Sequence, residues 1–144
     1  MSLNLDIKVR YKEGAPQLIQ IDKGGCVDFY NYNDLDLKAG HFAMIDTGVA
    51  IGIPDGYDLL IFPRSSTFKR YGLIETNSVG YVDNSFRGSD DFIHIPVLAT
   101  KDIFIPRGSR CFQFRLINMQ PTLNFTAVNE LEHKNRKGFG STGM

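Results

Sequence analysis

Residues 42–62, with the sequence FAMIDTGVAIGIPDGYDLLIF, decide the fold class of this chain. Residues 42–53 form a long β-type run that is broken by Thr47-Gly48 and ends at the turn sequence Pro-Asp-Gly. A second β-type run, residues 57–62, begins directly after that turn. Two such runs joined by a tight turn predict a β-hairpin, so the segment favours a fold built from β-strands.

Short β-type runs separated by turn residues recur along the rest of the chain, with no internal repeat. Many short strands with regularly spaced turns predict an all-β fold, a distorted jelly roll or barrel. One segment, residues 65–71, is expected to be a helix of about two turns, with Ser65 and Ser66 as its capping residues. The further expected strands are residues 5–11, 73–75, 80–82, 92–98, 103–105, 111–117 and 124–128.

The composition is that of one globular domain. The chain has 144 residues, of which 42% are hydrophobic and 22% charged. Its 16 Lys and Arg balance its 16 Asp and Glu, which gives no support for nucleic-acid or membrane-surface binding. No apolar run approaches the ~18 residues that span a bilayer, and no secretory leader is visible, so we expect a cytoplasmic protein.

Cysteine and histidine residues do not indicate a metal centre. Cys26 and Cys111 lie far apart without metal-like spacing, so we expect reduced, partly buried thiols. His41, His94 and His133 also lack the spacing of a zinc site and are expected to be ordinary surface or half-buried residues.

The C-terminal segment differs from the rest in composition. Residues 132–137 are polar and charged, and residues 138–143 are rich in glycine. Such a segment cannot bury enough apolar surface to order itself, so it is either disordered or ordered by a ligand or a neighbouring subunit. We therefore divide the chain into a β-barrel domain, residues 1–131, and a mobile tail, residues 132–144.

Three segments could carry chemistry. Arg64 with the two following serines, at the start of the short helix, can bind phosphate through N–H groups, hydroxyls and a guanidinium, or be plain helix capping beside a surface Arg. Asp83, on a turn, can orient and deprotonate a water, or serve only turn hydrogen bonding. The tail matches G-x-G-x-x-G but lacks the strand and helix of a dinucleotide site; it can wrap a phosphate or simply be a flexible tail.

Taken in order, five motifs resemble those of the trimeric dUTPase family, especially its members from Gram-positive bacteria and their phages. The resemblance covers about residues 25–143, with family-like spacing. The motifs are GCVDF at 25–29, PRSS at 63–66, NSVGYVDNSFRG at 77–88, RGSRCFQ at 107–113 and RKGFGSTG at 136–143.

The resemblance implies hydrolysis of dUTP to dUMP and pyrophosphate with Mg²⁺, in a homotrimer with shared active sites. One subunit supplies the first, second and fourth motifs, a second subunit the third, and the tail of a third closes over the nucleotide. Asp83 would activate the water that attacks the α-phosphorus, and Asp28 would contact the magnesium ion through water. The implied phosphate-binding residues are Arg64, Ser65, Ser66 and Gln113.

The same resemblance implies how the nucleoside is recognised. The segment 77–82 would form a hairpin that receives uracil, and Phe86, where the family usually has Tyr, would pack against the deoxyribose. In the tail, Arg136 is preferred to Lys134 as the cation that meets the γ-phosphate, because its guanidinium binds in a bidentate manner. The implied residues are Asn77, Gly80, Tyr81, Val82 and Phe86 for the nucleoside, and Arg136, Phe139, Gly140, Ser141 and Thr142 for the tail.

Two alternatives remain open. A dCTP deaminase shares this fold, but it needs a Glu general base on the strand after the third motif, and residues 88–94 contain no Glu. A non-catalytic scaffold that binds a protein such as a repressor is the other alternative, and such a regulatory partner can also coexist with catalysis.

Overall fold

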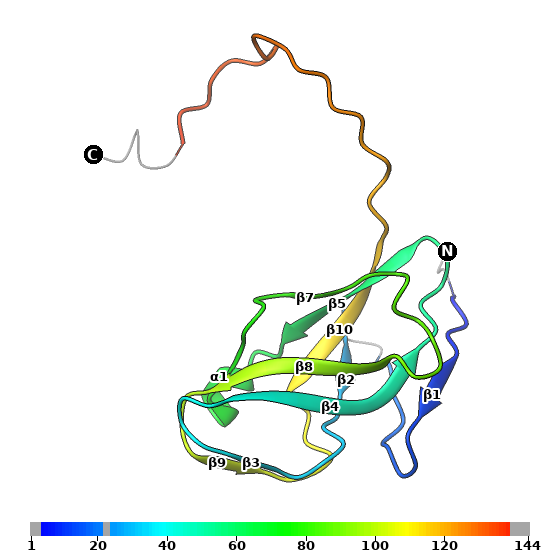
Figure 1. The fold of residues 1–144 in the computed structure, drawn as a ribbon, viewed down its shortest axis with the longest axis vertical. Coiled ribbons are helices and arrows are strands. Elements are labelled where there is room, and N and C mark those ends of the chain that lie inside the picture. Colours follow the sequence, from blue (N-terminus) through cyan, green and yellow to red (C-terminus); the bar gives the residue numbers. More distant parts are fainter. Residues whose placement is uncertain (1–3, 22–23, 139–144) are drawn as a thin grey trace.

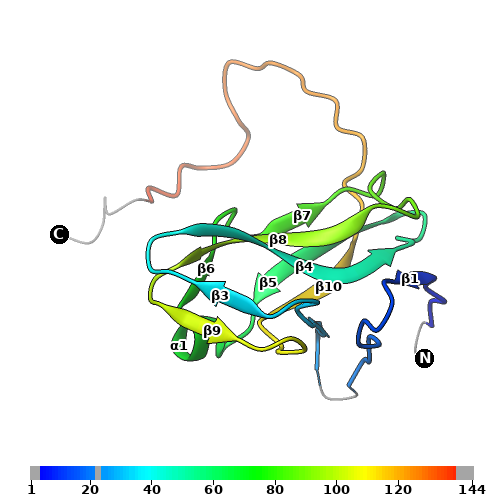
Figure 2. The same cartoon turned by 60° about the horizontal axis from the view of Figure 1, so that its bottom comes forward.

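The computed structural model describes residues 4–21 and 24–138, and it places two antiparallel four-stranded sheets face to face (Figure 1). The first sheet has the order β1-β4-β8-β6, formed by Val9–Tyr11, Phe42–Ile51, Phe92–Ala99 and Leu73–Glu75. The second has the order β2-β10-β5-β7, formed by Val27–Phe29, Phe112–Asn118, Tyr57–Pro63 and Gly80–Val82. The ribbon β3-β9, Leu35–Leu37 and Ile103–Ile105, and the helix α1, Thr67–Tyr71, lie at one end of the sheets (Figure 2).

The core lies between the two sheets and follows from the alternation of side chains along the strands. In β8, Ile93, Ile95 and Val97 are almost completely buried, while the residues between them face outward. From the second sheet, Phe29 packs against Phe114 with ring centroids 4.5 Å apart. The predicted all-β, jelly-roll-like fold is confirmed, and its single helix in the described residues is short.

The hairpin predicted for residues 42–62 is wrong, although its turn forms. The Tyr57 N–H donates to the Pro54 carbonyl at 3.2 Å, and Gly56 adopts a φ of 85°. However, β4 pairs with β1 and β8, whereas β5 pairs with β10 and β7. Both edges of each strand are occupied by partners from elsewhere in the chain, so the turn carries the chain from one sheet to the other.

Other expected elements differ at their ends. β1 begins at Val9 rather than at residue 5, α1 begins at Thr67, and the strands β2 and β3 were not expected. Residues 124–128 form no strand. The chain leaves the barrel after β10, and residues 119–138 extend away from it (Figure 1), so no strand of the same chain lies beside them.

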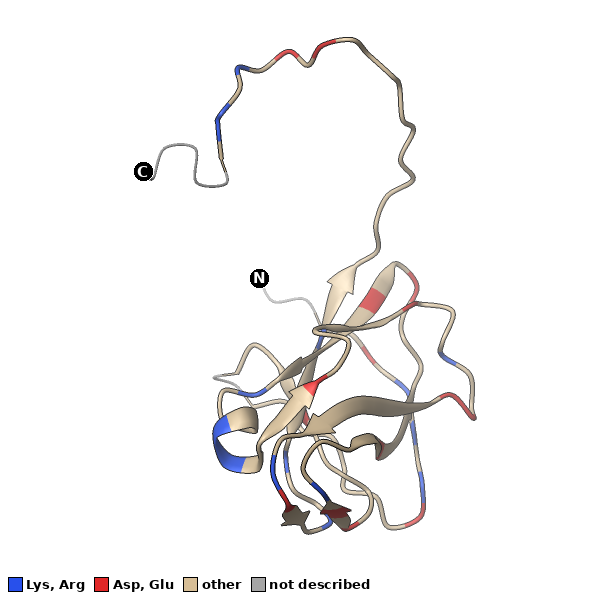
Figure 3. Ribbon diagram, turned by 60° about the vertical axis from the view of Figure 1, so that its left-hand side comes forward, with Lys and Arg blue, Asp and Glu red and all other residues tan. Residues whose placement is uncertain are grey.

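Charged residues of both signs are interspersed along the barrel (Figure 3). No helix in the ranges 4–21 and 24–138 is long and apolar enough to cross a membrane. Both cysteines are free; Cys111 is buried, which raises the pKa of its thiol to about 12, whereas Cys26 is half-buried. The expectation of reduced, partly buried thiols agrees with these positions.

Candidate active site

Three strands of the second sheet bring together Asp28, Arg64, Arg110 and Gln113, which we call the Arg64 cluster. β10 lies between β2 and β5, and its Gln113 stands opposite Asp28 in the register. Arg64 follows the last residue of β5, where the Gln113 amide donates to the Pro63 carbonyl at 3.1 Å. Residues from the first, second and fourth motifs therefore meet at one end of the sheet.

The Arg64 cluster is held by ion pairs around one carboxylate. Arg64 Nε lies 3.0 Å from Asp28 Oδ1, and Arg110 Nη1 lies 3.4 Å from Asp28 Oδ2. Arg64 Nη1 also donates to the Arg110 carbonyl at 2.9 Å. Two guanidinium groups share one carboxylate, so the cluster keeps a net positive charge and further N–H groups that can bind an anion. Arg110 was not assigned from the sequence, although it lies within the fourth motif.

The start of α1 differs from the predicted capping. Ser66 occupies the N-cap position but makes no side-chain capping bond. Instead the buried Thr67 hydroxyl accepts the Arg64 N–H at 2.7 Å and donates to the Cys111 carbonyl. The Thr67 hydroxyl therefore links the residues before the helix to the segment before β10, and it caps no N–H of the helix. Ser65 is exposed and Ser66 half-buried, so a ligand can reach both hydroxyls.

The turn that follows β6 carries Asn77 at the surface. The Ser78 N–H donates to the Glu75 carbonyl at 3.2 Å, and Ser78 has a φ of 62°. The predicted hairpin over this segment is incorrect in one respect, because β6 pairs with β8 and β7 with β5. The turn connects two different sheets, so its two sides are splayed rather than joined by a ladder. It places Gly80 inside, Val82 half-buried and Tyr81 outside.

Glu75 is a buried carboxyl next to this turn that sequence reasoning missed. Its side chain is 5% exposed, and neither oxygen has a hydrogen-bond partner. Burial raises the pKa of Glu75 to about 7, and the nearby Gly80 N–H opposes that shift without hydrogen-bond geometry. No local pattern distinguishes this Glu from an exposed one, because its burial depends on how the sheets pack.

Asp83 lies directly after β7, on an exposed turn. Its Oδ1 accepts the Ser85 N–H at 2.8 Å, and its carbonyl accepts the Phe86 N–H at 2.9 Å. The Ser85 side chain and backbone N–H lower the pKa of Asp83, so its carboxylate is ionised at neutral pH. The turn bonding considered from the sequence is therefore present, and it leaves an accessible, charged carboxylate.

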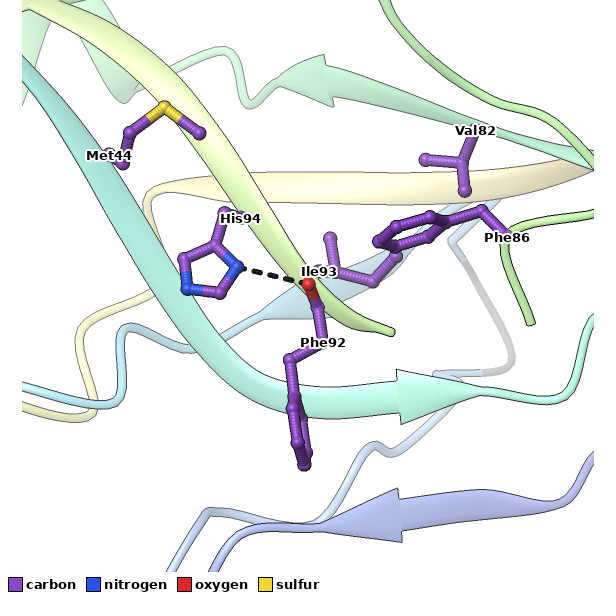
Figure 4. A pocket seen from close by; sticks show the side chains of 6 residues that line it. All are labelled: Met44, Val82, Phe86, Phe92, Ile93 and His94. Atoms are coloured by element: carbon purple, nitrogen blue, oxygen red, sulfur yellow. Dashed lines mark hydrogen bonds between the residues drawn. The ribbon is translucent and has the colours of Figure 1, made fainter. Parts of the chain in front are cut away.

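Phe86 lines a shallow, mainly apolar depression of about 390 Å³ (Figure 4). Its ring faces Val82, and the His94 Nδ1 lies 3.0 Å from the Phe92 carbonyl. Phe86 itself is 41% exposed, so one side of the ring is accessible. The lining residues are Met44, Val82, Phe86, Phe92, Ile93 and His94.

The Arg64 cluster and the turn that carries Asp83 lie at opposite ends of β5. Val82 pairs with Leu59 near the beginning of that strand, and Asp83 follows it, whereas Arg64 comes directly after the end of the strand. A strand rises about 3.3 Å per residue, so Asp83 and Arg64 of one chain are separated by roughly 20 Å. One chain therefore does not bring Asp83 to its own Arg64 cluster.

The remaining predicted site residues belong to the tail. Arg136 and Lys134 are both exposed, and the segment that carries them, residues 119–138, extends away from the barrel (Figure 1). Phe139, Gly140, Ser141 and Thr142 lie outside the described residues.

The fit of these residues to a magnesium ion depends on Asp28. In the described parts of the chain, no three His, Cys, Asp or Glu side chains are grouped to hold a metal. Asp28 is a single carboxylate whose oxygens already face Arg64 and Arg110. This donor set suits an ion that keeps its waters and takes most of its ligands from phosphates.

Comparisons with known proteins identify the family. The dUTPase family model matches residues 22–143. The chain is 36% identical over 140 residues to the SPbeta prophage-derived deoxyuridine 5'-triphosphate nucleotidohydrolase of Bacillus subtilis, covering 96% of this chain and 99% of that protein. It is 36% identical over 118 residues to the deoxyuridine 5'-triphosphate nucleotidohydrolase of Finegoldia magna, covering 79% and 80%.

Two solved structures share the fold. A mutant dUTPase of Staphylococcus bacteriophage 80alpha, solved with dUpNHpp, has a TM-score of 0.78 at 20% identity, covering 98% of this chain and 100% of that one. A mutant dUTPase of phage phi11 of S. aureus, whose structure describes a structural Mg(II) ion, has a TM-score of 0.73 at 19% identity, covering 90% and 100%. By its family match and by relatives that align along its length, the chain belongs to the dUTPase family.

Proposed function

We propose that this chain hydrolyses dUTP to dUMP and pyrophosphate in active sites that are shared between copies of the chain in a homotrimer. Membership of the dUTPase family supports the reaction. The observation that carries the shared site is the separation of Asp83 from the Arg64 cluster, at opposite ends of β5. A carboxylate roughly 20 Å from the phosphate-binding residues cannot serve the same nucleotide unless a second copy supplies one of them.

The Arg64 cluster binds the phosphates. Arg64 is oriented by Asp28 and by the Arg110 carbonyl, so its remaining N–H groups can form a bidentate contact with phosphate oxygens. The hydroxyls of Ser65 and Ser66 and the amide of Gln113 add hydrogen bonds. Magnesium, when bound with the triphosphate, neutralises part of its charge, and Asp28 is the residue that would hold the ion through water.

Asp83 of a neighbouring copy acts as the general base. Its carboxylate is ionised and exposed, and it removes a proton from the water that attacks the α-phosphorus. The turn from Asn77 through Gly80, Tyr81 and Val82 receives uracil through its backbone groups and the Asn77 amide. A base that presents mismatched hydrogen-bonding groups leaves buried polar atoms unpaired, which costs about 1–3 kcal/mol each. Phe86 offers its exposed ring face to the deoxyribose.

Exposed apolar surface supports the association of several copies. Phe42, Met44 and Ile74 are 61%, 51% and 45% exposed. Phe42 and Ile74 both stand opposite Leu98 of β8, so they flank this strand on the outer face of the first sheet. Beyond the barrel, Phe125 is 90% exposed. Apolar groups gathered in this way are typical of a surface that another chain covers.

The division into a barrel domain and a tail, predicted as residues 1–131 and 132–144, is part of this proposal, with residues 119–131 counted with the segment outside the barrel. Residues 119–138 contain no strand or helix and lie outside the barrel. An extended segment of that length spans up to roughly 65 Å, enough to reach a neighbouring active site. There Arg136 would meet the γ-phosphate and Phe139 the base, with Gly140, Ser141 and Thr142 around the phosphates. Residence in the cytoplasm remains a prediction.

A mixing experiment tests the shared site. Arg64→Gln and Asp83→Asn chains are each expected to show little activity at limiting dUTP, because every site lacks either the Arg64 contact to phosphate or the general base. When equal amounts of the two chains are refolded together and assemble at random, about a quarter of the sites should combine an intact Arg64 from one chain with an intact Asp83 from the other. The mixture should therefore show about a quarter of the wild-type activity. Mixing Asp83→Asn with Asp83→Ala is the matched control and should restore nothing. No recovery in the first mixture would contradict a shared site.

Substrate selectivity tests the reaction itself. Pyrophosphate release should be observed from dUTP and not from dCTP, dTTP or UTP, with magnesium present. Release of ammonia from dCTP would support the deaminase alternative. The strand β8, where that enzyme needs a Glu, contains none, and the buried Glu75 lies before the turn that carries Asn77. Absence of turnover by a folded chain would favour a binding scaffold with a regulatory partner.

A further inference from the structure

A buried carboxylate, Asp58, lies beneath the loop that carries Asp83. Asp58 is only 3% exposed, although it stands near the beginning of β5. Its Oδ1 accepts the Asn84 N–H at 2.8 Å, and its Oδ2 accepts the Tyr81 hydroxyl. A buried carboxylate is destabilising unless donors satisfy its oxygens. Here the two donors come from residues on either side of Asp83 in the chain.

The same loop is fastened by a second set of bonds. The Asn84 side-chain amide donates to the carbonyls of Pro54 at 2.9 Å and Tyr57 at 2.8 Å. Arg87 Nη1 donates to the Ile53 carbonyl at 3.0 Å and contacts the Asp55 carboxylate at 2.7 Å. The segment 81–87 is therefore tied to the connection between β4 and β5, and Asp58 is the buried member of that attachment.

We propose that Asp58 is a positioning residue of the active site, which holds the loop 83–86 so that the Asp83 carboxylate is placed for proton removal. This inference rests on the proposed function, because it assigns Asp58 a role in the reaction that Asp83 performs. Asp58 acts through Tyr81 and Asn84 and touches neither substrate nor water in the reaction.

The chemistry of the contact explains why a carboxylate serves better than an amide. Both oxygens of the buried Asp58 accept hydrogen bonds, and bonds to an ionised acceptor are roughly twice as strong as neutral ones. An Asn at this position would present an NH₂ group to one of the two donors. A displacement of a catalytic group by about 1 Å lowers the rate roughly 100-fold, so a loosened loop affects the chemical step directly.

The first test compares Asp58→Asn with Asp36→Asn, which changes an exposed carboxylate on β3, away from this loop. Asp58→Asn should lower kcat for dUTP by roughly 10- to 100-fold and change KM by a smaller factor, because the phosphate-binding residues lie at the other end of β5 and only the uracil-binding turn is affected. Asp36→Asn should leave kcat within about twofold of the wild type. An unchanged kcat in a folded Asp58→Asn chain, or a change in KM alone, would overturn the inference.

The second test asks whether Asp58 acts through Asp83. In an Asp83→Asn background, adding Asp58→Asn should lower the residual rate by less than about twofold, because the positioned group is already absent. An equal fractional loss in both backgrounds would show a merely structural role and contradict the inference. Should Asp58→Asn fail to fold, Tyr81→Phe removes one of the same bonds from an exposed side chain and is expected to lower kcat in the same direction.

A spectroscopic signature separates this inference from the proposed function. The hydrogen bond to Asp58 raises the pKa of Tyr81 above its ordinary value. Subtracting the ultraviolet pH titration of Tyr81→Phe from that of the wild type isolates the ionisation of the Tyr81 phenol. The midpoint of this ionisation should move to lower pH when the same subtraction is made in the Asp58→Asn background. Absence of that movement would refute the anchoring contact itself. If the movement occurs but Asp83→Asn retains full turnover, then the proposed base is wrong and the assigned role of Asp58 is refuted with it.

Discussion

The Arg64 cluster and the Asp83 loop lie at opposite ends of one strand and are built by different means. The cluster joins side chains from three strands and is held by ion pairs that are partly exposed to solvent. The Asp83 loop is a local turn, and a buried carboxylate beneath it, Asp58, receives two of its donors. Partly exposed ion pairs can rearrange around a bound anion, whereas a loop fixed by buried hydrogen bonds holds its shape before substrate arrives.

This difference shows what each end of the strand requires. Phosphates are large, symmetric and highly charged, so a set of adjustable cations can bind them. Proton removal requires a carboxylate at one distance and angle, so the loop around Asp83 has to be placed in advance. We therefore expect substitutions at the Asp83 end to reduce the rate of the chemical step and substitutions at the Arg64 end to weaken binding and local stability.

The largest effect should come from Asp83→Asn. Loss of the general base is expected to raise the barrier by about 3–5 kcal/mol, which lowers kcat about 10²–10⁴-fold. Pyrophosphate release at saturating dUTP measures it, and Asp90→Asn, whose side chain is 90% exposed, is the control. Full activity of Asp83→Asn would show that the Asp83 end of β5 does not carry the general base.

Glu75→Gln should change how stability depends on pH. Burial raises the pKa of Glu75 from 4.5 to about 7 in the folded chain, so the folded state retains a proton that the unfolded state releases. The free energy of unfolding that depends on this group is fully present below pH 4.5 and is lost as pH rises through about 7. This increase in the pKa of Glu75 corresponds to a change of at most about 3 kcal/mol in the free energy of unfolding.

The measurement is urea denaturation between pH 5 and pH 8. The stability difference between Glu75→Gln and the wild type should grow with pH in favour of the variant, because Gln carries no charge to bury. Glu130→Gln, at an exposed position, should show no such trend. A constant difference across this range would mean that Glu75 is not buried in the folded protein.

Thr67→Val tests whether the hydrogen bonds of the buried Thr67 hydroxyl stabilise the backbone next to the Arg64 cluster. The change keeps the shape of the side chain but leaves the Arg64 N–H and the Cys111 carbonyl without their partner. A buried unpaired polar group costs about 1–3 kcal/mol, so the free energy of unfolding should fall by about that amount. Denaturant midpoints measure it, with the exposed Thr122→Val as control. Equal stability of Thr67→Val and the wild type would disprove this role of the hydroxyl.

Phe86→Tyr should have the smallest effect. Phe86 already presents its ring face beside an apolar depression, and the added hydroxyl lies at the edge of that ring. We expect the ratio of kcat/KM for dUTP and UTP to change by less than about threefold, under 1 kcal/mol. A change of more than about tenfold would mean that the missing hydroxyl, and not the ring, discriminates the sugar.

The resemblance of five motifs to the dUTPase family was informative about part of the site. Arg64, Gln113 and Asp28 were predicted to act together, and the structure brings them to one end of the second sheet. Arg110 was overlooked inside a motif that had been identified. Asp58 and Glu75 could not be found, because nothing adjacent to them in the chain indicates that they are buried.

Local physical chemistry was enough to locate the turn after β4 and the strand β8. Pro-Asp-Gly at 54–56 and the alternating pattern of β8 act over a few residues, and both features appear in the structure. Pairing partners were decided only by the tertiary structure. β4 and β5 follow one another with a tight turn between them, yet they enter different sheets. The hydrogen bonds between strands and the burial of their side chains depend on residues far away in the chain. A short stretch of sequence therefore does not indicate which distant strand will pair with it.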